Sequence, residues 1–286
     1  MTKNERFNDS IGALFTDDLE LAKICILKSS TDIGVRRNLG RAGSRFSPKS
    51  IVNILKKMTN TDFTDSHFIE YEVSNEQSEA KNFEDAQLLE SSKIQKHIGK
   101  FNKYIHIGGG HDHVFPMLKS IIETLKQKEL YIINIDAHLD TRVDMQRHSG
   151  TPFRDIDKLK PKSAYLYQYG IHNFSNSHKT KTELSHINQK VFPKGDKRFF
   201  DEISKIPKDS FVFLSLDADA LDSSQMQAVS AVNPNGVELE QMRDIIELVK
   251  EFKESMFGVY EYNPIYDDLS QKGAKNICSL IYQYLL

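Results

Sequence analysis

Six side chains in three short segments are of the types that bind metal ions. They are His111 in GGGHD, Asp136, His138 and Asp140 in DAHLD, and Asp217 and Asp219 in SLDADALD. Alternate side chains of an extended chain share a face, so Asp136, His138 and Asp140 are expected to converge on one point. Four carboxylates and two imidazoles are too many for one small ion. Their four negative charges would balance two divalent ions, with Asp136 and Asp217 bridging them.

The types of donor atom indicate which metal these residues would bind and which reaction it would support. Carboxylate-rich ligation with little nitrogen and no sulfur favours Mn²⁺ over structural Zn²⁺. Two such ions about 3.5–4 Å apart can share a water and lower its pKa toward neutrality, which supplies a nucleophile for hydrolysis. Taken alone, each segment has a simpler explanation, because an aspartate at the end of a strand is usually a turn residue. Three such segments, each after a predicted strand, favour the metal site.

Short apolar runs precede the segments that carry candidate ligand or substrate-binding residues, which we call the loaded segments. These runs predict buried strands. The predicted strands are 25–27, 104–107, 131–135, 164–169, 211–216 and 256–260, and the last of them runs into Glu261 in EYNP. Segments 114–127 and 239–252 carry apolar residues at helical spacing and predict helices. This alternation predicts an α/β fold whose parallel sheet is covered by helices on both sides. Ligands bind at the carboxyl ends of the strands in such sheets, so the loaded segments should meet there.

Two polar segments carry weaker signals. Residues 59–100 predict either a helix-rich excursion or long surface loops, and their role is open. Residues 173–197 predict mainly loop and short helix. Neither an internal repeat nor a linker divides the sequence, so one domain spanning residues 1–286 is expected.

Composition excludes several classes of partner. The net charge is −2 and the sequence pI is about 6.6, so no basic surplus indicates a nucleic-acid partner. No apolar run approaches the roughly 18–20 residues that cross a bilayer, and residues 1–15 lack the apolar stretch of a signal peptide. Cys25 and Cys278 are too few and too far apart to predict a disulfide framework. A cytoplasmic protein without a membrane partner is expected.

The motifs resemble those of the arginase/agmatinase/formimidoylglutamase family of ureohydrolases. GGGHD, DAHLD, SLDADALD and the Glu-x-Asn-Pro of EYNP follow one another in the family's order over residues 100–264. The resemblance implies a three-layer α/β/α sandwich with a mainly parallel sheet of about eight strands and two Mn²⁺ ions per subunit. It implies that one ion takes His111, Asp136, Asp140 and Asp217, and that the other takes His138, Asp136, Asp217 and Asp219. Glu261 would hold the cationic amidine or guanidine group of a small-molecule substrate.

Local features favour the formimidoylglutamase branch of the family. The run GVRRNLGRAG at residues 34–43 resembles the GVRRNGGRxG run of that branch, although Leu39 replaces a glycine. SGTPF at residues 149–153 resembles another of its segments. Ser175 and Asn176 in GIHNFSN are uncharged where arginases place acids for a free α-ammonium group. N-formimidoyl-L-glutamate has no such group, so an uncharged loop fits this substrate better than arginine.

The resemblance also suggests roles around the substrate. Arg142 offers a bidentate clamp for a substrate carboxylate, and Ser149, Asn176 and Glu261 are the other expected contacts. Arginases carry a histidine that the resemblance implies to be the proton shuttle at the position of Ser149, whereas here His148 lies one residue earlier. Asp140 or His148 is therefore expected to pass a proton to the leaving nitrogen, while Glu261 aligns the formimidoyl carbon. The expected products are L-glutamate and formamide.

Three other functions remain open from the sequence. The first is an agmatinase, guanidinobutyrase or arginase-type hydrolase that releases urea. The second is a dinuclear metallophosphoesterase, although its Asp-x-His motif precedes the Gly-Asn-His stretch and here GGGHD comes first. The third is a non-catalytic family member that keeps the metal site. Family members are often homo-oligomers, which makes a homo-oligomer an expectation of the resemblance.

Overall fold

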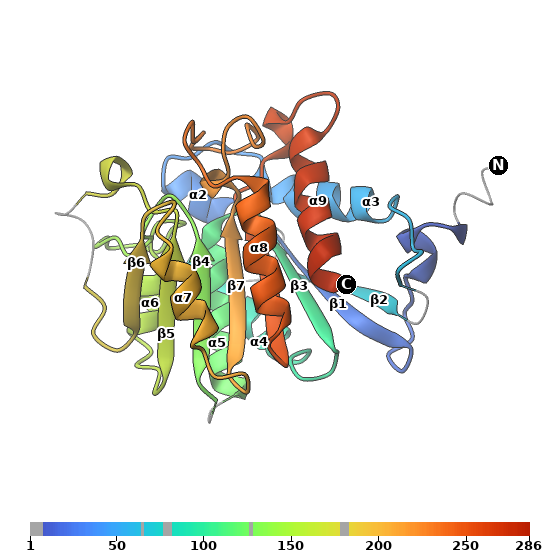
Figure 1. Cartoon of the computed structure of the whole chain (residues 1–286), viewed down its shortest axis with the longest axis horizontal. Helices are drawn as coiled ribbons and strands as arrows, with labels where there is room; N and C mark the ends of the chain where they lie inside the picture. The colour runs from blue at the N-terminus through green and yellow to red at the C-terminus, as the bar shows by residue number, and fades with distance from the viewer. Residues whose placement is uncertain (1–7, 64–65, 77–81, 126–127, 178–182) are drawn as a thin grey trace.

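An eight-stranded sheet forms the middle layer of this computed structural model, which describes residues 8–63, 66–76, 82–125, 128–177 and 183–286 (Figure 1). The strand order is β2-β1-β3-β8-β7-β4-β5-β6, and every neighbouring pair is parallel. The strands are β1 (Ala22–Ser30), β2 (His67–Asn75), β3 (Lys103–Gly108), β4 (Leu130–Ile135), β5 (Ala164–Tyr169), β6 (Asn188–Phe192), β7 (Phe211–Asp217) and β8 (Glu254–Tyr260). The predicted fold class is confirmed.

Helices form the two outer layers. The α-helices are α2 (Ile33–Arg37), α3 (Ser47–Leu55), α4 (Phe83–Gln95), α5 (Val114–Thr124), α6 (Pro152–Asp157), α7 (Arg198–Ser204), α8 (Leu239–Lys250) and α9 (Lys272–Leu285). In Figure 1, α7, α8 and α9 lie in front of the sheet, and α4, α5 and α6 lie behind it. The 3₁₀ turns are η1 (Ile11–Leu14), η2 (Ser44–Phe46), η3 (His111–His113), η4 (Asn173–Ser175), η5 (Ala218–Ala220) and η6 (Pro264–Tyr266).

The strands are apolar on both faces because helices cover both. In β1, Ile24 and Ile26 join the core cluster that contains residues of α3, α7, α8 and α9. The alternate residues Cys25 and Leu27 join the opposite cluster, which contains residues of α4, α5 and α6. Successive side chains of a strand point to opposite faces, so a strand buried on both sides reads as a continuous apolar run. This is why periodicity of two is absent from the runs that predicted the strands.

The two strands that were not predicted are the two edges of the sheet. Residues 59–100 hold the strand β2 as well as the helix α4, and residues 173–197 hold the strand β6 as well as the 3₁₀ turn η4. Each segment thus contains one strand that the sequence did not predict. An edge strand has a neighbour on one side only and is often less covered. In β6, Asn188, Lys190 and Val191 are exposed, which leaves no apolar run to detect. Edge strands that carry lysine also resist pairing with other chains.

The four strands that end in the loaded segments are neighbours in the middle of the sheet. Their order is β3, β8, β7 and β4, although β4 and β7 are separated in the chain by β5 and β6. Because all are parallel, their carboxyl ends lie at the same edge. The fold therefore gathers GGGHD, DAHLD, SLDADALD and EYNP at one place.

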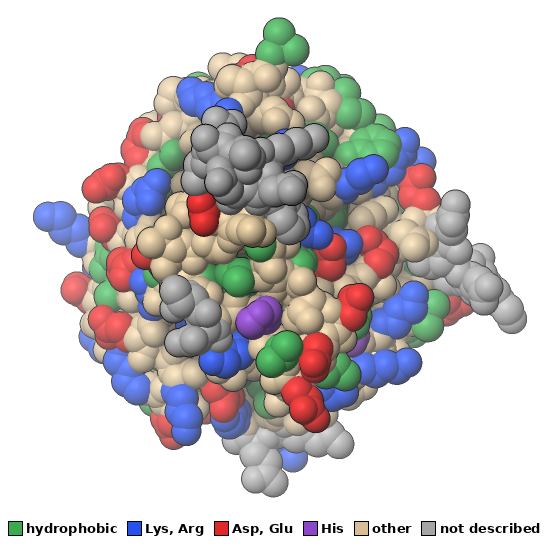
Figure 2. Space-filling model, turned by 90° about the vertical axis from the view of Figure 1, so that its right-hand side faces the viewer, with side chains coloured by type: hydrophobic (Ala, Val, Ile, Leu, Met, Phe, Trp, Pro, Cys, Tyr) green, Lys and Arg blue, Asp and Glu red, His purple; other side chains and the backbone are tan. Residues whose placement is uncertain are grey.

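The surface visible in Figure 2 mixes charges. Lys and Arg side chains are interspersed with Asp and Glu side chains on this face, which offers no continuous basic surface in its described part. None of the described helices is long and apolar enough to cross a membrane.

Candidate metal centre

The carboxyl ends of β3, β4 and β7 bring the predicted ligands together in two groups. In the first, His111 Nδ1 lies 2.6 Å from Asp140 Oδ2, 3.2 Å from Asp136 Oδ2 and 3.4 Å from Asp217 Oδ2. One ligand atom from each of these four residues lies within 4.8 Å of the others. This is the set expected for the first ion.

The second group consists of Asp136, His138 and Asp219. His138 Nδ1 lies 3.6 Å from Asp136 Oδ1 and 3.4 Å from Asp219 Oδ2. Asp136 belongs to both groups and turns one oxygen toward each, which is the arrangement of a bridging ligand. Asp217 was expected in both groups but falls only in the first, and its Oδ1 accepts a hydrogen bond of 2.9 Å from the Asp219 N–H.

Turns in which a side-chain carboxylate accepts a backbone hydrogen bond bring these residues together, and an extended strand does not. β4 ends at Ile135. The Oδ1 atom of Asp136 then accepts a 2.7 Å hydrogen bond from the N–H of His138, two residues on. Asp217 makes the same turn with Asp219. The expected convergence is present, but its physical cause is a turn that folds residue i+2 against the carboxylate of residue i.

Backbone constraints around the cluster are unusual. Asp140 and Glu261 both have positive φ angles, 51° and 63°, which L-residues rarely adopt. Such strained residues persist where the surrounding structure fixes them, and they gather at functional sites. A Cβ on Gly109 would lie 1.9 Å from the carbonyl oxygen of Thr31, so the end of β3 passes β1 only because this residue is glycine.

Neighbouring side chains orient the ligands. The Nε2 atom of His111 hydrogen-bonds the Ser215 hydroxyl at 2.9 Å, which leaves Nδ1 directed at the carboxylates. The Asn134 amide donates to Asp136 Oδ2 at 3.2 Å. Such outer partners fix the ring orientation of a metal-binding histidine. The Oδ1 atom of Asp219 is buried and has no hydrogen-bond partner among the residues that the structure describes, as expected of an atom that a cation would satisfy.

The charges of the cluster hold protons in the absence of metal. Burial, together with the charges of Asp219 and Asp136, raises the pKa of Asp217 well above its usual range. Burial alone would lower the pKa of His111, but hydrogen bonds and charge from Asp136 and Asp140 raise it to about 10. The charge of Asp219 is the main cause that raises the pKa of His138 to about 12. Divalent cations would replace these protons, so the donor set fits such ions.

Glu261 lies beside the cluster in a cleft of about 240 Å³ that four of the six cluster residues also line, namely His138, Asp140, Asp217 and Asp219. Its Oε1 atom accepts a 2.9 Å hydrogen bond from the backbone N–H of His111, which ties the end of β8 to the turn after β3. Burial raises the pKa of Glu261 to about 8, and the charge of Asp219 adds to that shift. A cationic group in the cleft would stabilise the ionised carboxylate.

The rim of the cleft is a connected set of polar side chains. Arg142 is exposed and donates from its guanidinium to Asn38 Oδ1 at 2.6 Å, and Asn38 donates to the Ser149 hydroxyl at 3.0 Å. All three line the cleft. The buried Arg154 donates to the carbonyl oxygens of Arg142 and Asp144, so it holds the loop that carries Arg142.

Two predicted site residues point elsewhere. The ring of His148 accepts from the Gly150 N–H at 3.1 Å and contacts Asp144 at 2.8 Å, and His148 is not among the described residues that line the cleft. The Asn176 side chain accepts from the Leu139 N–H and donates to the Ala137 carbonyl, so it supports the loop after β4. It also lines a hollow of about 20 Å³ next to Arg142.

The family of the chain follows from comparison with known proteins. The sequence model of the Arginase family matches residues 22–286. This chain belongs to the arginase family.

Individual relatives agree with this family. The arginase-family chain is 28% identical over 258 residues to the formimidoylglutamase of Salmonella agona, which covers 86% of this chain and 80% of the relative. Its structure is similar to that of formiminoglutamase from Trypanosoma cruzi with Mn²⁺, with a TM-score of 0.80 and 21% identity over 97% of both chains. It is also similar to formimidoylglutamase from Bacillus subtilis, with a TM-score of 0.79 and 18% identity over 96% of this chain and 91% of the other.

Some residues at the site of this arginase-family protein were not predicted. Asn38 lies within GVRRNLGRAG and Ser215 within SLDADALD, so their place inside the motifs was the available signal. Glu90 of α4 contacts His113 from outside every motif, at 2.9 Å from the ring Nδ1 atom. No pattern in the polar segment around it marks Glu90 as part of a site.

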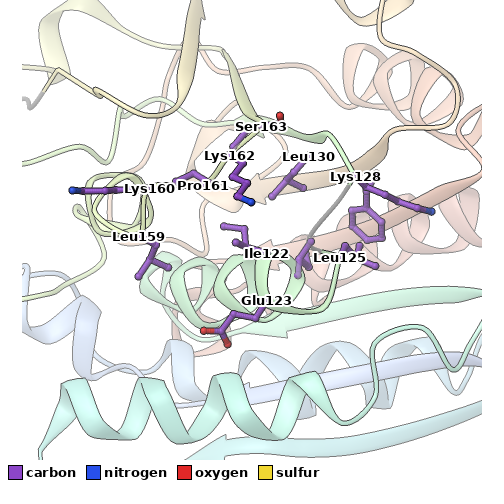
Figure 3. A pocket seen from close by; sticks show the side chains of 13 residues that line it. Ile122, Glu123, Leu125, Lys128, Leu130, Leu159, Lys160, Pro161, Lys162 and Ser163 are labelled. Carbon is purple, nitrogen blue, oxygen red and sulfur yellow. The ribbon is translucent and has the colours of Figure 1, made fainter.

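A second hollow, of about 480 Å³, lies at the opposite end of the sheet (Figure 3). It is lined by the end of α5 and by residues at or before the start of β4, β5 and β7, with aliphatic side chains such as Ile122 and Leu125 directed into it. Its described lining contains no histidine and one acid, Glu123, so it lacks the donors of a metal site.

Proposed function

We propose that this chain hydrolyses a C–N bond of a linear amidine, N-formimidoyl-L-glutamate, to give L-glutamate and formamide. The observation that carries the proposal is one cleft that both ligand groups line together with Glu261 and Arg142. The first group contributes Asp140 and Asp217 to its lining, and the second contributes His138 and Asp219. Relatives that cover most of the chain are named formimidoylglutamase, and they support this substrate over other amidines and guanidines.

Two Mn²⁺ ions are the proposed cofactors. His111, Asp140 and Asp217 would hold one, His138 and Asp219 the other, and Asp136 would join both. Oxygen-rich donors suit this ion, and the Trypanosoma cruzi relative was crystallised with it. When bound, the ions would act as Lewis acids that lower the pKa of water in the cleft and so provide the nucleophile.

The side chains of the chain position the substrate. The Glu261 carboxylate pairs with the amidinium group and aligns the formimidoyl carbon with the cluster. The Arg142 guanidinium, at the rim, pairs with a substrate carboxylate through two parallel N–H donors. Agmatine has no carboxylate, so this arginine favours a substrate that carries one.

Proton transfer to the leaving nitrogen falls to Asp140. Of the two candidates, Asp140 lines the cleft, whereas His148 hydrogen-bonds Asp144 and Gly150. Asp140 would turn Oδ2, the oxygen that contacts His111, toward the metal. The other oxygen of the same carboxylate could take a proton from the attacking water and return it to the leaving nitrogen.

A substrate panel tests the proposal. The manganese-loaded protein would be given formimidoylglutamate, agmatine, guanidinobutyrate and arginine, with formamide, ammonia and urea measured separately. We expect formamide and glutamate in equal amounts from the first substrate and a much lower kcat/KM for the others. Urea as the main product would support the urea-releasing alternative. Turnover of a phosphate ester alone would support a phosphoesterase, and bound manganese without any turnover would support a non-catalytic member.

The Asp136→Ala variant tests the shared ligand. Because Asp136 belongs to both groups, its loss should lower the manganese content of both positions and abolish activity together. Asp222→Ala is the control, since Asp222 follows in the same motif but caps the turn at Ser224. Full turnover by Asp136→Ala protein that holds no manganese would refute the mechanism.

We further propose a cytoplasmic, homo-oligomeric enzyme. Cys25 and Cys278 are free and buried, which fits a reducing compartment. Cell fractionation tests the location, and light scattering of the purified protein tests the oligomeric state.

A further inference from the structure

A chain of buried hydrogen bonds runs beneath the cleft from α4 to the end of β8. The Glu90 carboxylate lies 2.6 Å from the Ser29 hydroxyl, which lies 2.8 Å from His106 Nε2. The other ring nitrogen of His106, Nδ1, lies 2.8 Å from the Tyr260 hydroxyl. All four side chains are at most 1% exposed.

One arrangement of hydrogens satisfies this chain. An ionised carboxylate only accepts, so the Ser29 hydroxyl donates its single hydrogen to Glu90. Ser29 then accepts from the Nε2–H of His106. A neutral imidazole with hydrogen on Nε2 has its acceptor at Nδ1, which receives the Tyr260 hydroxyl. Each group therefore donates to the next, from Tyr260 through His106 and Ser29 to Glu90, which is the last acceptor.

Helix α4 also holds the turn that carries His111. Both oxygens of Glu90 lie 2.9 Å from His113 Nδ1, and His113 Nε2 is 3.1 Å from the Thr31 hydroxyl. Gln87 lies one helical turn earlier, on the same face of α4. Its amide donates to the carbonyl oxygen of Asp112 at 3.2 Å. Two side chains of α4 thus hold the 3₁₀ turn η3 in place by hydrogen bonds.

Both ends of this network border the candidate site. His113 shares η3 with His111, so a fixed His113 ring limits where His111 can lie. Tyr260 immediately precedes Glu261, whose φ of 63° needs support from its surroundings. The Tyr260 ring also lies 5.3 Å from the His111 ring.

We propose that Glu90 is a positioning residue for this site, because it orients His111 through His113 and Glu261 through the chain that ends at Tyr260. The inference rests on the proposed function, since it assumes that His111 binds metal and that Glu261 binds the amidine. It assigns a role to residues of the polar segment 59–100 that no motif marks. Groups bonded directly to a metal ligand are worth about 10–100-fold in metal affinity or activity. Glu90 acts through one further residue, so an effect near the lower end of that range is expected.

Three variants of α4 test this role by manganese affinity, by kcat and KM measured separately, and by the Tm of the metal-free protein. Glu90→Ala should weaken manganese binding and lower kcat, each by about tenfold. Glu90→Gln keeps an oxygen that can accept from both the Ser29 hydroxyl and His113 Nδ1, since both contact Oε1 of Glu90. Its manganese affinity and kcat should therefore lie much closer to wild type than those of Glu90→Ala. Ser91→Ala is the control, because it removes a buried contact of α4 with Ser120 at 3.1 Å that does not reach the cleft. It should leave manganese affinity and kcat near wild type.

A fourth variant decides the matter if the Glu90 variants do not fold. Tyr260→Phe removes only the hydroxyl at the far end of the chain, so it should raise KM for the amidine or lower kcat severalfold while manganese affinity is kept. Unchanged kinetics in this variant, or a Glu90→Ala protein with wild-type manganese affinity, overturns the inference. Wild-type protein that binds no manganese, or that hydrolyses no amidine, contradicts the proposed function instead.

Discussion

Asp136 and Asp217 are chemically identical side chains whose protons respond in opposite ways. Burial alone would raise the pKa of Asp136, but hydrogen bonds from His111 and His138 outweigh it and lower the pKa. Asp217 lies beside other carboxylates, and burial and their charge raise its pKa. The difference comes from the neighbours and not from the residue type. The metal-free cluster is therefore a mixture of protonated and ionised groups, and a cation that binds there must displace the protons.

Manganese binding should release protons and should tighten as pH rises. The folded, metal-free protein holds a proton on His111 up to about pH 10, whereas an unfolded histidine loses it near 6.5. Between these two pKa values the native state binds the proton of His111 and the unfolded chain does not. The stability that this proton contributes therefore falls as pH rises from 6.5 to about 10. Added manganese should stabilise the protein more at pH 8.5 than at pH 6.

Calorimetry in two buffers of different ionisation enthalpy would count the released protons. Tm measured with and without manganese between pH 6 and 8.5 would give the trend in stability. Binding that releases no proton, or that weakens as pH rises over this range, would show that the histidines do not give up protons to the metal.

Arg142 offers a prediction about the substrate. Arg142→Leu should raise KM for formimidoylglutamate, with a smaller effect on kcat, because it removes a contact made to the bound substrate and not to the reacting carbon. Because Arg142 is exposed, solvent screening limits its pair with a carboxylate to about 1 kcal/mol, or roughly fivefold in KM. A simple alkyl formamidine without carboxylates is the matched control substrate. Equal losses on both substrates would mean that Arg142 shapes the loop and does not bind carboxylate.

At the scale of elements, burial decided which strands were predicted. The central strands β3, β4, β7 and β8 are buried on both faces, so short apolar runs marked them. β2 and β6 lie at the edges and have mixed burial, so their sequences read as polar segments. The helix predicted at residues 239–252 is α8, which ends at Lys250. The helix predicted at 114–127 is α5, which ends at Thr124, with residues 126 and 127 outside the described part.

The turn after α2 carries a strained leucine. Leu39 has a φ of 62° and is 95% exposed. Its left-handed backbone conformation costs free energy that no packing of the side chain offsets. That conformation costs an L-residue about 1–2 kcal/mol, and the extra freedom of glycine in the unfolded chain offsets roughly 0.5–1 kcal/mol. Leu39→Gly should therefore raise the free energy of unfolding by up to about 1 kcal/mol in urea denaturation.

The control for this change is another exposed turn leucine. Leu19 is 60% exposed and is not among the described residues with positive φ. Leu19→Gly should lower the free energy of unfolding, because glycine brings freedom to the unfolded chain without relieving strain. The same sign for both variants would mean that the strain at Leu39 is small.

At the scale of the whole molecule, the two apolar cores contain none of the six candidate metal ligands. One core lies on each face of the sheet, and both consist of buried aliphatic and aromatic side chains. The metal centre lies at the strand ends, where the carboxylates repel one another without cations. The fold and the site are thus stabilised by different forces.

Removal of the metal should therefore lower the free energy of unfolding without unfolding the protein. A site filled at a hundred times its Kd adds about 2.7 kcal/mol, which for a chain of this size is roughly 5–10 °C in Tm. Removal of manganese by a chelator should lower Tm by at least that amount, leave the far-UV circular dichroism unchanged and be reversed by added manganese. Loss of the far-UV signal on chelation would show that the sheet needs the metal.

Residue types and spacing were enough to predict the class of the fold and to propose the chemistry of the site. The six candidate ligands, Glu261 and the alternation of apolar runs with helical patterns are local features that the chain displays directly. The tertiary structure alone decided that β3, β8, β7 and β4 are neighbours, that Asp136 joins both ligand groups, and that Glu90 lies beneath them. Strand order and side-chain contact arise from packing between segments far apart in the chain, and no local pattern encodes that packing.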